Sequence, residues 1–418
     1  MTPLTQSRYA EPAEYDVTPA SNQRFHLSPQ APLLIAAGLA TGPVVALGFG
    51  RFAYALLLPP MQTALNWSYV QAGAMNTANG LGYLLGAVLA PVLMRWSGVR
   101  AAFMVSLLGI ALTLALTALS GELRWLAAMR FLTGLGGAVT FTSGGLLVAQ
   151  VASAAPPQRA GAVLSLFYAG AGLGILLTGL GLPPLLAHLG ADGWRAGWLG
   201  LGLVSFLGLG VAWTAARHTA AQLHGSAAIR MAQLWPLRSS LIAYACAGLG
   251  YVAYTTFSIS YLRSQGASTP LITLFWALLG LAGVLAPLVW SRLLSRRWGG
   301  RSMGILMLLM GTGAALPVLS TLPWVAALSA VLFGLTALSV VASTTTLVRQ
   351  SLPAAVWGAG VATYTVTFAA FQSLGPLLTG ALADTGTGGL RWGLGASAVL
   401  LMVGAGVAFS QRVVGDHG

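Results

Sequence analysis

Long apolar stretches without internal acids or lysines dominate this 418-residue chain and restrict what it can fold into. Twelve of them are about 20 residues long, enough for a helix that rises 1.5 Å per residue to cross a bilayer core of ~30 Å. Their approximate limits are residues 32–60, 68–94, 101–120, 125–153, 160–187, 194–214, 239–262, 269–293, 302–320, 323–348, 355–382 and 391–411. The sequence therefore predicts a chain that crosses a lipid bilayer twelve times.

The continuity of these stretches distinguishes between the two structures that can span a membrane. Strands of a membrane barrel alternate apolar and polar residues over about ten positions. A helix satisfies its own backbone hydrogen bonds and can be apolar on every side. We therefore predict an all-α integral membrane protein.

The composition excludes several other classes of protein. Charged residues make up 6% of the chain and hydrophobic residues 56%, whereas soluble domains carry about 25% charged residues because their surfaces face water. The net charge of +13 comes from arginines that occur singly between apolar runs. A nucleic-acid-binding surface needs basic residues clustered on one face. We expect a lipid bilayer around the chain and no nucleic-acid partner.

No cofactor, metal centre or disulfide framework is predicted. Cys246 is the one cysteine and lies in an apolar stretch, which favours inert packing. The five histidines show no pair at ligand spacing. Residues 48–53 match a dinucleotide-binding pattern, but they lie inside a predicted span, where that motif's strand and turn cannot form.

The arginines are distributed unevenly between the two sides of the predicted membrane. With the amino terminus inside, fourteen lie in inner loops and tails, and four (Arg124, Arg195, Arg263 and Arg391) lie in outer loops. The positive-inside rule assigns the arginine-rich side to the cytoplasm. We predict a monomeric, multi-pass protein of the bacterial inner membrane with both termini cytoplasmic.

Short sequence matches about 200 residues apart indicate an internal duplication. Val88–Pro91 matches Val284–Pro287, and Leu176–Gly179 matches Leu377–Gly380 in the same order. Carriers are often built from repeated halves. We expect a disordered cytoplasmic tail over residues 1–30, which lack a signal-peptide pattern. Six-helix bundles over 31–214 and 237–411, a cytoplasmic linker over 215–236 and a tail over 412–418 complete the predicted organisation.

Two stretches resemble motifs of the major facilitator superfamily of transporters. Arg130-x-x-x-Gly134-x-Gly136 looks like the pattern that the superfamily carries in its fourth span. The first span contains Gly-Phe-Gly-Arg-Phe-Ala-Tyr at 48–54 and Leu-Leu-Pro-Pro-Met at 57–61, which closely resembles the signature of the YbfB/YjiJ group. The resemblance implies two pseudo-repeated six-helix bundles that rock about a central cavity. The glycines after Arg130 are also expected to let two helices approach closely.

A third motif of the superfamily fits only in part. The loop after the second span carries Gly86, Arg95, Gly98 and Arg100 but lacks the acidic residue of G-x-x-x-D-R-x-G-R-R. This departure weakens the expected charge relay of the inner gate. Arg95 and Arg100 are candidate gating residues on the resemblance alone.

Arg51 is the main candidate for binding a substrate. It lies well inside the first predicted span, where an arginine costs ~2.5 to 3.5 kcal/mol. We predict that it faces a cavity and binds a carboxylate or other anion through its planar donors. The alternative is that it ties helix ends together through backbone carbonyls or reaches the outer surface.

Polar side chains on single helix faces are the other candidates for a cavity wall. Asn76, Asn79 and Tyr83 share one face of the second span, and such polar groups need either a wet cavity or a bond to a neighbouring helix. Tyr251 and Thr255 share a face of the seventh span. The predicted substrate-binding set is Arg51, Tyr54, Asn76, Asn79, Tyr83, Tyr251, Thr255 and Gln372, the last on a face shared with Phe368.

Candidates for coupling or gating lie near the span ends. No Asp, Glu, Lys or His lies in the middle of a predicted span, although a proton-coupled carrier usually titrates such a group at depth. Coupling to protons would therefore use a rim carboxylate such as Glu122 or Asp384, or a proton carried by the substrate. Arg130 either takes part in coupling or anchors the helix at the interface beside Glu122. Pro376 provides either a flexing point or a static kink.

The leading hypothesis is a carrier of a small organic solute, with a weak preference for an anionic one. Uptake and efflux remain alternatives. A membrane receptor that kept the carrier fold is the second hypothesis, and it would be expected to carry a sizeable soluble extension. An enzyme would need catalytic groups at depth, and the missing ionisable residues argue against one.

Overall fold

The computed structural model describes residues 31–190, 192–219, 229, 231–296 and 298–412. In this part of the chain, twelve helical runs are long and apolar enough to cross a membrane, and no strand occurs. These findings confirm the predicted all-α class and the number of spans. The predicted tail over 1–30, residues 220–228 and 230 of the predicted linker over 215–236, and residues 413–418 lie outside the described residues.

Each half of the chain contributes six of the twelve runs. The first half comprises α1 (Ala31–Leu39), α2 (Thr41–Pro43), η1 (Val44–Phe52) and α3 (Tyr54–Leu65) as one run, then α4 (Tyr69–Ser97), α5 (Val99–Thr117), α6 (Leu123–Ala154), α7 (Pro157–Leu189) and α8 (Gly193–Ala216). The second comprises α9 (Met231–Leu234), η2 (Trp235–Leu237) and α10 (Arg238–Ser264) as one run, then α11 (Thr269–Leu294), α12 (Arg301–Leu319), α13 (Pro323–Ser351), η3 (Ala354–Val356) with α14 (Trp357–Ala383), and α15 (Gly389–Phe409).

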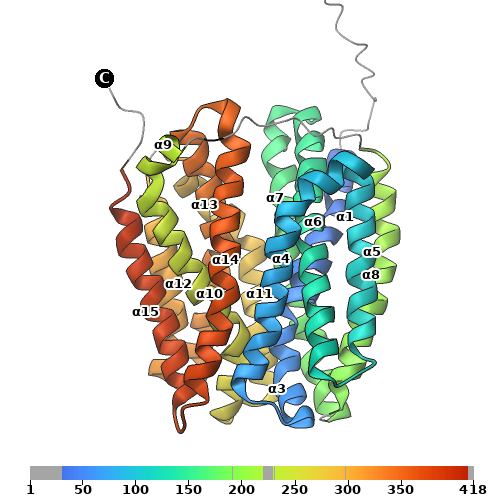
Figure 1. Cartoon of the computed structure of the whole chain (residues 1–418), viewed down its shortest axis with the longest axis vertical. Coiled ribbons are helices and arrows are strands. Elements are labelled where there is room, and N and C mark those ends of the chain that lie inside the picture. The colour runs from blue at the N-terminus through green and yellow to red at the C-terminus, as the bar shows by residue number, and fades with distance from the viewer. Residues whose placement is uncertain (1–30, 191, 220–228, 230, 297, 413–418) are drawn as a thin grey trace, which may run out of the picture.

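The two halves stand side by side, with their helices roughly parallel to one long axis (Figure 1). We call the end of the molecule that carries α9 the linker end. The opposite end, which carries the connections between α3 and α4 and between α14 and α15, is the far end. The first span is longer than predicted, because α3 continues through Pro59 and Pro60 and ends only where Asn66 takes up a left-handed conformation (φ 53°).

The helices α4 and α11 occupy matching places in the two halves and begin in the same way. The Ser68 hydroxyl accepts a hydrogen bond from the amide of Gln71, and the Gln71 side chain accepts one from the amide of Ser68. The hydroxyl of Ser268 likewise accepts one from the amide of Leu271. Such caps satisfy amides that have no partner within the helix.

Small residues bring neighbouring helices into backbone contact within each half. A methyl group on Gly134 of α6 would overlap the carbonyl oxygen of Asn79, and one on Gly82 of α4 would overlap that of Phe131. Gly136 faces α5 instead, against Ile110. Lipid chains are as apolar as side chains, so close van der Waals packing of this kind drives helix association in a bilayer. The predicted role of the glycines after Arg130 is confirmed.

The two most extensive contacts between the halves are seams where α4 packs on α14 and α7 packs on α11, and α3 also contacts α10. In the first seam the Thr77 hydroxyl donates to the carbonyl oxygen of Ser373 at 2.6 Å. In the second, a methyl group on Gly172 would lie 2.5 Å from the amide nitrogen of Val284. Both contacts lie near the middle of the helices, and further contacts of each seam follow toward the far end.

The seam between α7 and α11 ends toward the linker end. Tyr168 lies one turn before Gly172 on the same face of α7, yet its side chain is 42% exposed. Leu288, one turn beyond Val284 on α11, is 71% exposed. Along this seam the halves are therefore joined from the middle to the far end and lose contact toward the linker end.

Candidate functional site

The middle of the first span is a π-helix, and it carries Arg51. The amide of Ala53 donates to the carbonyl oxygen of Gly48, five residues earlier, at 2.9 Å. Gly48 also lies against Gly174 of α7, where any side chain would overlap the neighbouring backbone. Wide π turns occur frequently at functional sites because they displace side chains from the regular helical positions.

Arg51 reaches from the first half to the second. Its Nη2 donates to Oε1 of Gln372 on α14. Its guanidinium lies 5.8 Å from the ring centre of Tyr83 on α4 and 5.7 Å from that of Tyr251 on α10. Contacts of a cation with ring faces contribute ~0.5 to 2 kcal/mol and offset part of its desolvation. The structure thus gathers four predicted binding residues from four elements.

Gln372 has hydrogen-bonding capacity left over. Its side chain is fully buried, and its Nε2 has no hydrogen-bond partner, although Oε1 accepts from Arg51. Buried amides are rarely left with an unused donor, since the loss costs ~1 to 3 kcal/mol. The half-buried Arg51 and this free amide group lie next to one another at the meeting point of the halves.

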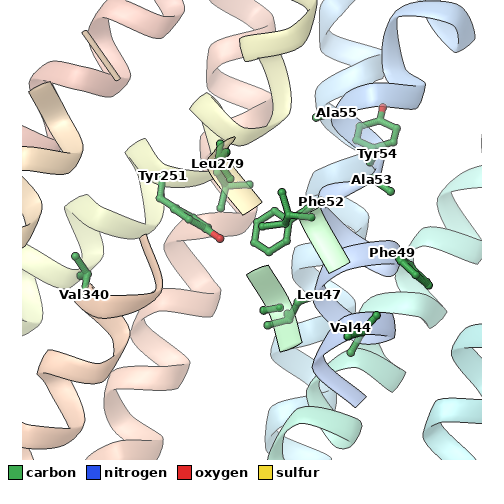
Figure 2. Close-up of a cluster of buried hydrophobic side chains, with 14 of the residues drawn as sticks. Val44, Leu47, Phe49, Phe52, Ala53, Tyr54, Ala55, Tyr251, Leu279 and Val340 are labelled. Carbon is green, nitrogen blue, oxygen red and sulfur yellow. The ribbon is translucent and has the colours of Figure 1, made fainter. Parts of the chain in front are cut away.

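Aromatic side chains form the wall on the side of the second half. The Tyr251 ring stacks on Phe333 at 5.8 Å with an interplanar angle of 12°, and it contacts Phe368 at 5.8 Å and Phe52 at 6.2 Å. Figure 2 shows Phe52 and Tyr251 facing one another across the interface, whereas Tyr54 lies on another side of the first span. Sequence reasoning did not include Phe52, Phe333 or Phe368 in the binding set, although Phe368 shares the predicted face of Gln372.

Arg130 lies at depth and belongs to a different network. It is 2% exposed, Nη1 donates to the carbonyl oxygen of Gly50 at 2.5 Å, and Nη2 donates to Oδ1 of Asn76 at 2.7 Å. Its guanidinium lies 4.7 Å from the ring centre of Tyr54. Arg130 is therefore not an interfacial anchor beside Glu122, because α6 begins at Leu123 and Arg130 lies about two turns farther in.

Four predicted substrate contacts already bond to protein groups. The hydroxyl of Tyr54 donates to the carbonyl oxygen of Ala72 at 2.7 Å. Asn76 donates to Thr256 at 2.6 Å, and Asn79 donates to the carbonyl oxygen of Arg130 at 3.1 Å. Thr255 bonds to the carbonyl of Tyr251 in its own helix at 3.1 Å. The bonds of Asn76 and Asn79 match the alternative of bonding to a neighbouring helix, which the sequence left open, whereas Thr255 bonds within its own helix.

The predicted gating residues lie outside the central site. Arg95 and Arg100 are exposed at the linker end, around the turn at Gly98, and Glu122 is exposed at the far end. Pro376 is buried in α14, with its carbonyl oxygen against Gly73 of α4.

The carboxylate of Asp384 accepts hydrogen bonds from the amides of Tyr69 and Val70 at 2.9 and 2.8 Å.

In the described part of the chain, no group of three or more His, Cys, Asp or Glu side chains could hold a metal ion.

A family model described as "Uncharacterised MFS-type transporter YbfB" matches residues 43–409. A search of the curated proteins gives no match.

Two crystal structures of a bacterial homologue of the human lysosomal transporter Spinster share the fold. The inward-facing, unoccupied form has a TM-score of 0.70 and 14% identity, over 93% of this chain and 97% of that chain. The inward-facing, occupied form has a TM-score of 0.62 and 15% identity, over 89% and 95%.

Proposed function

Because the chain belongs to the family of MFS-type transporters described by the YbfB model, we propose that it carries a small organic anion across the membrane by alternating access. The observation that carries this proposal is the pairing of Arg51 with an unused amide donor of Gln372 where the two halves meet. We further propose a monomer in the bacterial inner membrane. The arginine distribution supports a linker end that faces the cytoplasm.

The charge of Arg51 is not neutralised by an acidic residue of the described chain. Glu122, Asp192 and Asp384 all lie at the far end, and the group that accepts from Arg51 is the neutral amide of Gln372. An anion stabilises a partly buried cation more than a neutral acceptor does, because it adds a direct charge–charge attraction and a carboxylate can accept two parallel bonds from the guanidinium. This favours an anionic substrate, and a carboxylate could accept from both Arg51 and Gln372.

The aromatic wall favours a substrate with an apolar body. The Arg51 guanidinium lies over the rings of Tyr83 and Tyr251. The Tyr251 ring in turn contacts Phe333 and Phe368, and Tyr83 and Phe368 are only partly buried. Ring faces and edges bind flat apolar groups while the cation binds the charged end. A small carboxylate with an apolar or ring-bearing body fits this combination best.

Flux measurements in liposomes test the proposal. A panel of carboxylates such as benzoate and phenylacetate, each with its uncharged amide, is first compared for thermal stabilisation of the purified protein. Radiolabelled flux is then measured for every compound that binds. We expect saturable flux of carboxylates and little or none of their amides. Binding without flux would support the receptor hypothesis instead.

Arg51 variants test the site. We expect Arg51→Ala to abolish flux with normal membrane insertion, and Arg51→Lys to lower kcat/KM about tenfold, because a point charge replaces a planar fork of donors. Arg124→Ala is the matched control, since Arg124 is exposed in the first turn of α6. Full flux in Arg51→Ala would contradict the assigned role.

A further inference from the structure

A side chain exposed to solvent joins the two halves at the far end. Asp384 directly follows α14 in the second half. Its Oδ1 accepts from the amide of Tyr69 at 2.9 Å, and its Oδ2 accepts from the amide of Val70 at 2.8 Å. These are the first two residues of α4 in the first half. One carboxylate therefore caps a helix of the opposite half with both of its oxygens.

The start of α4 depends on this contact for its amide partners. The first amides of a helix have no acceptor within it and carry the positive end of the helix dipole. Ser68 satisfies the amide of Gln71 with its hydroxyl and that of Ala72 with its carbonyl. The amides of Tyr69 and Val70 are left, and Asp384 supplies their acceptors.

The matching helix of the second half, α11, needs no acceptor for an amide at its second position. Its N-cap is Ser268, followed by Thr269 and Pro270. Pro270 has no amide hydrogen to be capped. The start of α11 therefore needs one acceptor fewer than the start of α4.

The contact lies at the closed end of the seam between α4 and α14. One turn before Asp384, Gly380 packs directly on the carbonyl of Tyr69. Two cavities of about 690 and 420 Å³ flank this position. Tyr69 lines both of them, and Asp384 lines the smaller. Water therefore reaches the carboxylate and can replace its bonds to the amides when the helices move apart.

We propose that Asp384 holds the far-end gate closed. Its carboxylate bridges the halves in the state described, and both hydrogen bonds must break before the central site can open to the far side. A gate has a role only in a transporter, so this proposal rests on the proposed function. The contact itself is tested without any substrate, so a failure of the transport assay leaves this test valid.

Cysteine accessibility measures the opening of this seam. Ser373 is 3% exposed on α14, where it packs against Gly80 of α4. Ser373→Cys in a Cys246→Ala background therefore gives one thiol inside the seam. The rate of its reaction with a soluble maleimide is measured on purified protein without substrate, and labelling after denaturation gives the total.

We expect Asp384→Asn to raise the labelling rate about tenfold, because the amide group presents a donor to one of the two N–H groups and the charge is lost. Asp384→Ala removes both acceptors and should act in the same direction. Asp384→Glu keeps the carboxylate and should stay closer to the original rate. Glu122→Gln is the matched control, since Glu122 is an exposed far-end acid that precedes α6 without a side-chain cap bond.

An increase confined to Asp384→Asn and Asp384→Ala supports the proposal. An unchanged or lower rate in both, with normal elution on gel filtration, would overturn it. An equal increase in Glu122→Gln would also overturn it, because the effect would then follow from far-end charge alone.

Discussion

Two arginines at similar depth have different environments, although each stands alone in an apolar run. Arg130 has two acceptors on neighbouring elements, Gly50 and Asn76, and is almost completely buried. Arg51 is half-buried and has a neutral acceptor from the opposite half. Arg130 therefore stabilises the π-helix through its bond to Gly50. Arg51, the next residue of that helix, points to the interface between the halves.

Replacing Arg130 tests this division. We expect Arg130→Met to lower the free energy of unfolding by about 1 to 3 kcal/mol, because the carbonyl of Gly50 and the side chain of Asn76 lose their donor. The melting temperature in detergent should fall accordingly. Arg124→Met, on an exposed position of the same helix, should change it little. An unchanged melting temperature in Arg130→Met would show that these two bonds contribute nothing net.

At the scale of elements, glycines decide how closely the helices approach. Gly134 lies against the backbone of α4 at Asn79, whereas Gly109 of α5 has nothing within 4 Å of the position a Cβ would take. Both glycines lie inside transmembrane helices. The same residue type therefore has a packing role at one position and none at the other.

This difference gives a matched pair of substitutions. We expect Gly134→Ala to destabilise the protein by about 1 to 3 kcal/mol, because the added methyl group forces α6 away from α4. Gly109→Ala should be neutral or slightly stabilising, since alanine restricts the unfolded chain more than glycine does. Thermal unfolding of the two variants in the same detergent measures both effects. Equal melting temperatures would contradict the packing role of Gly134.

For the whole molecule, the halves close at the far end and separate toward the linker end. The bonds of Asp384 and of Thr77 join α4 to α14 from the far end to the middle. Tyr168 and Leu288 are exposed, although Gly172 and Val284, one turn closer to the far end on the same helix faces, are packed together. Together with the arginine distribution, this arrangement favours a conformation that is closed on the outer side.

Single cysteines test that assignment in cells. Gln265 at the far end and Ser295 at the linker end are both exposed in the second half. In a Cys246→Ala background, we expect an impermeant maleimide to label Gln265→Cys in intact spheroplasts. Ser295→Cys should be labelled only after permeabilisation, because arginine-rich loops stay inside. The reverse pattern would invert the orientation.

The sequence by itself determined the helical class, the number of spans and the family. These properties depend on local hydropathy and on short motifs that need no knowledge of distant contacts. It also pointed to Arg51 as the central cation, because a charge inside an apolar run is visible from its neighbours. The sequence did not give the ends of the spans accurately, since α3 extends to Leu65.

Only the tertiary structure decided what each polar side chain contacts. Arg51 and Gln372 are 321 positions apart, and Asp384 reaches amides more than 300 positions earlier. Asn76 and Tyr83 share a helix face, yet one bonds to Arg130 and the other lies beside Arg51. Such pairings depend on how twelve helices pack against one another. A local pattern gives the direction of a side chain on its helix, but it does not give the partner of that side chain on another helix.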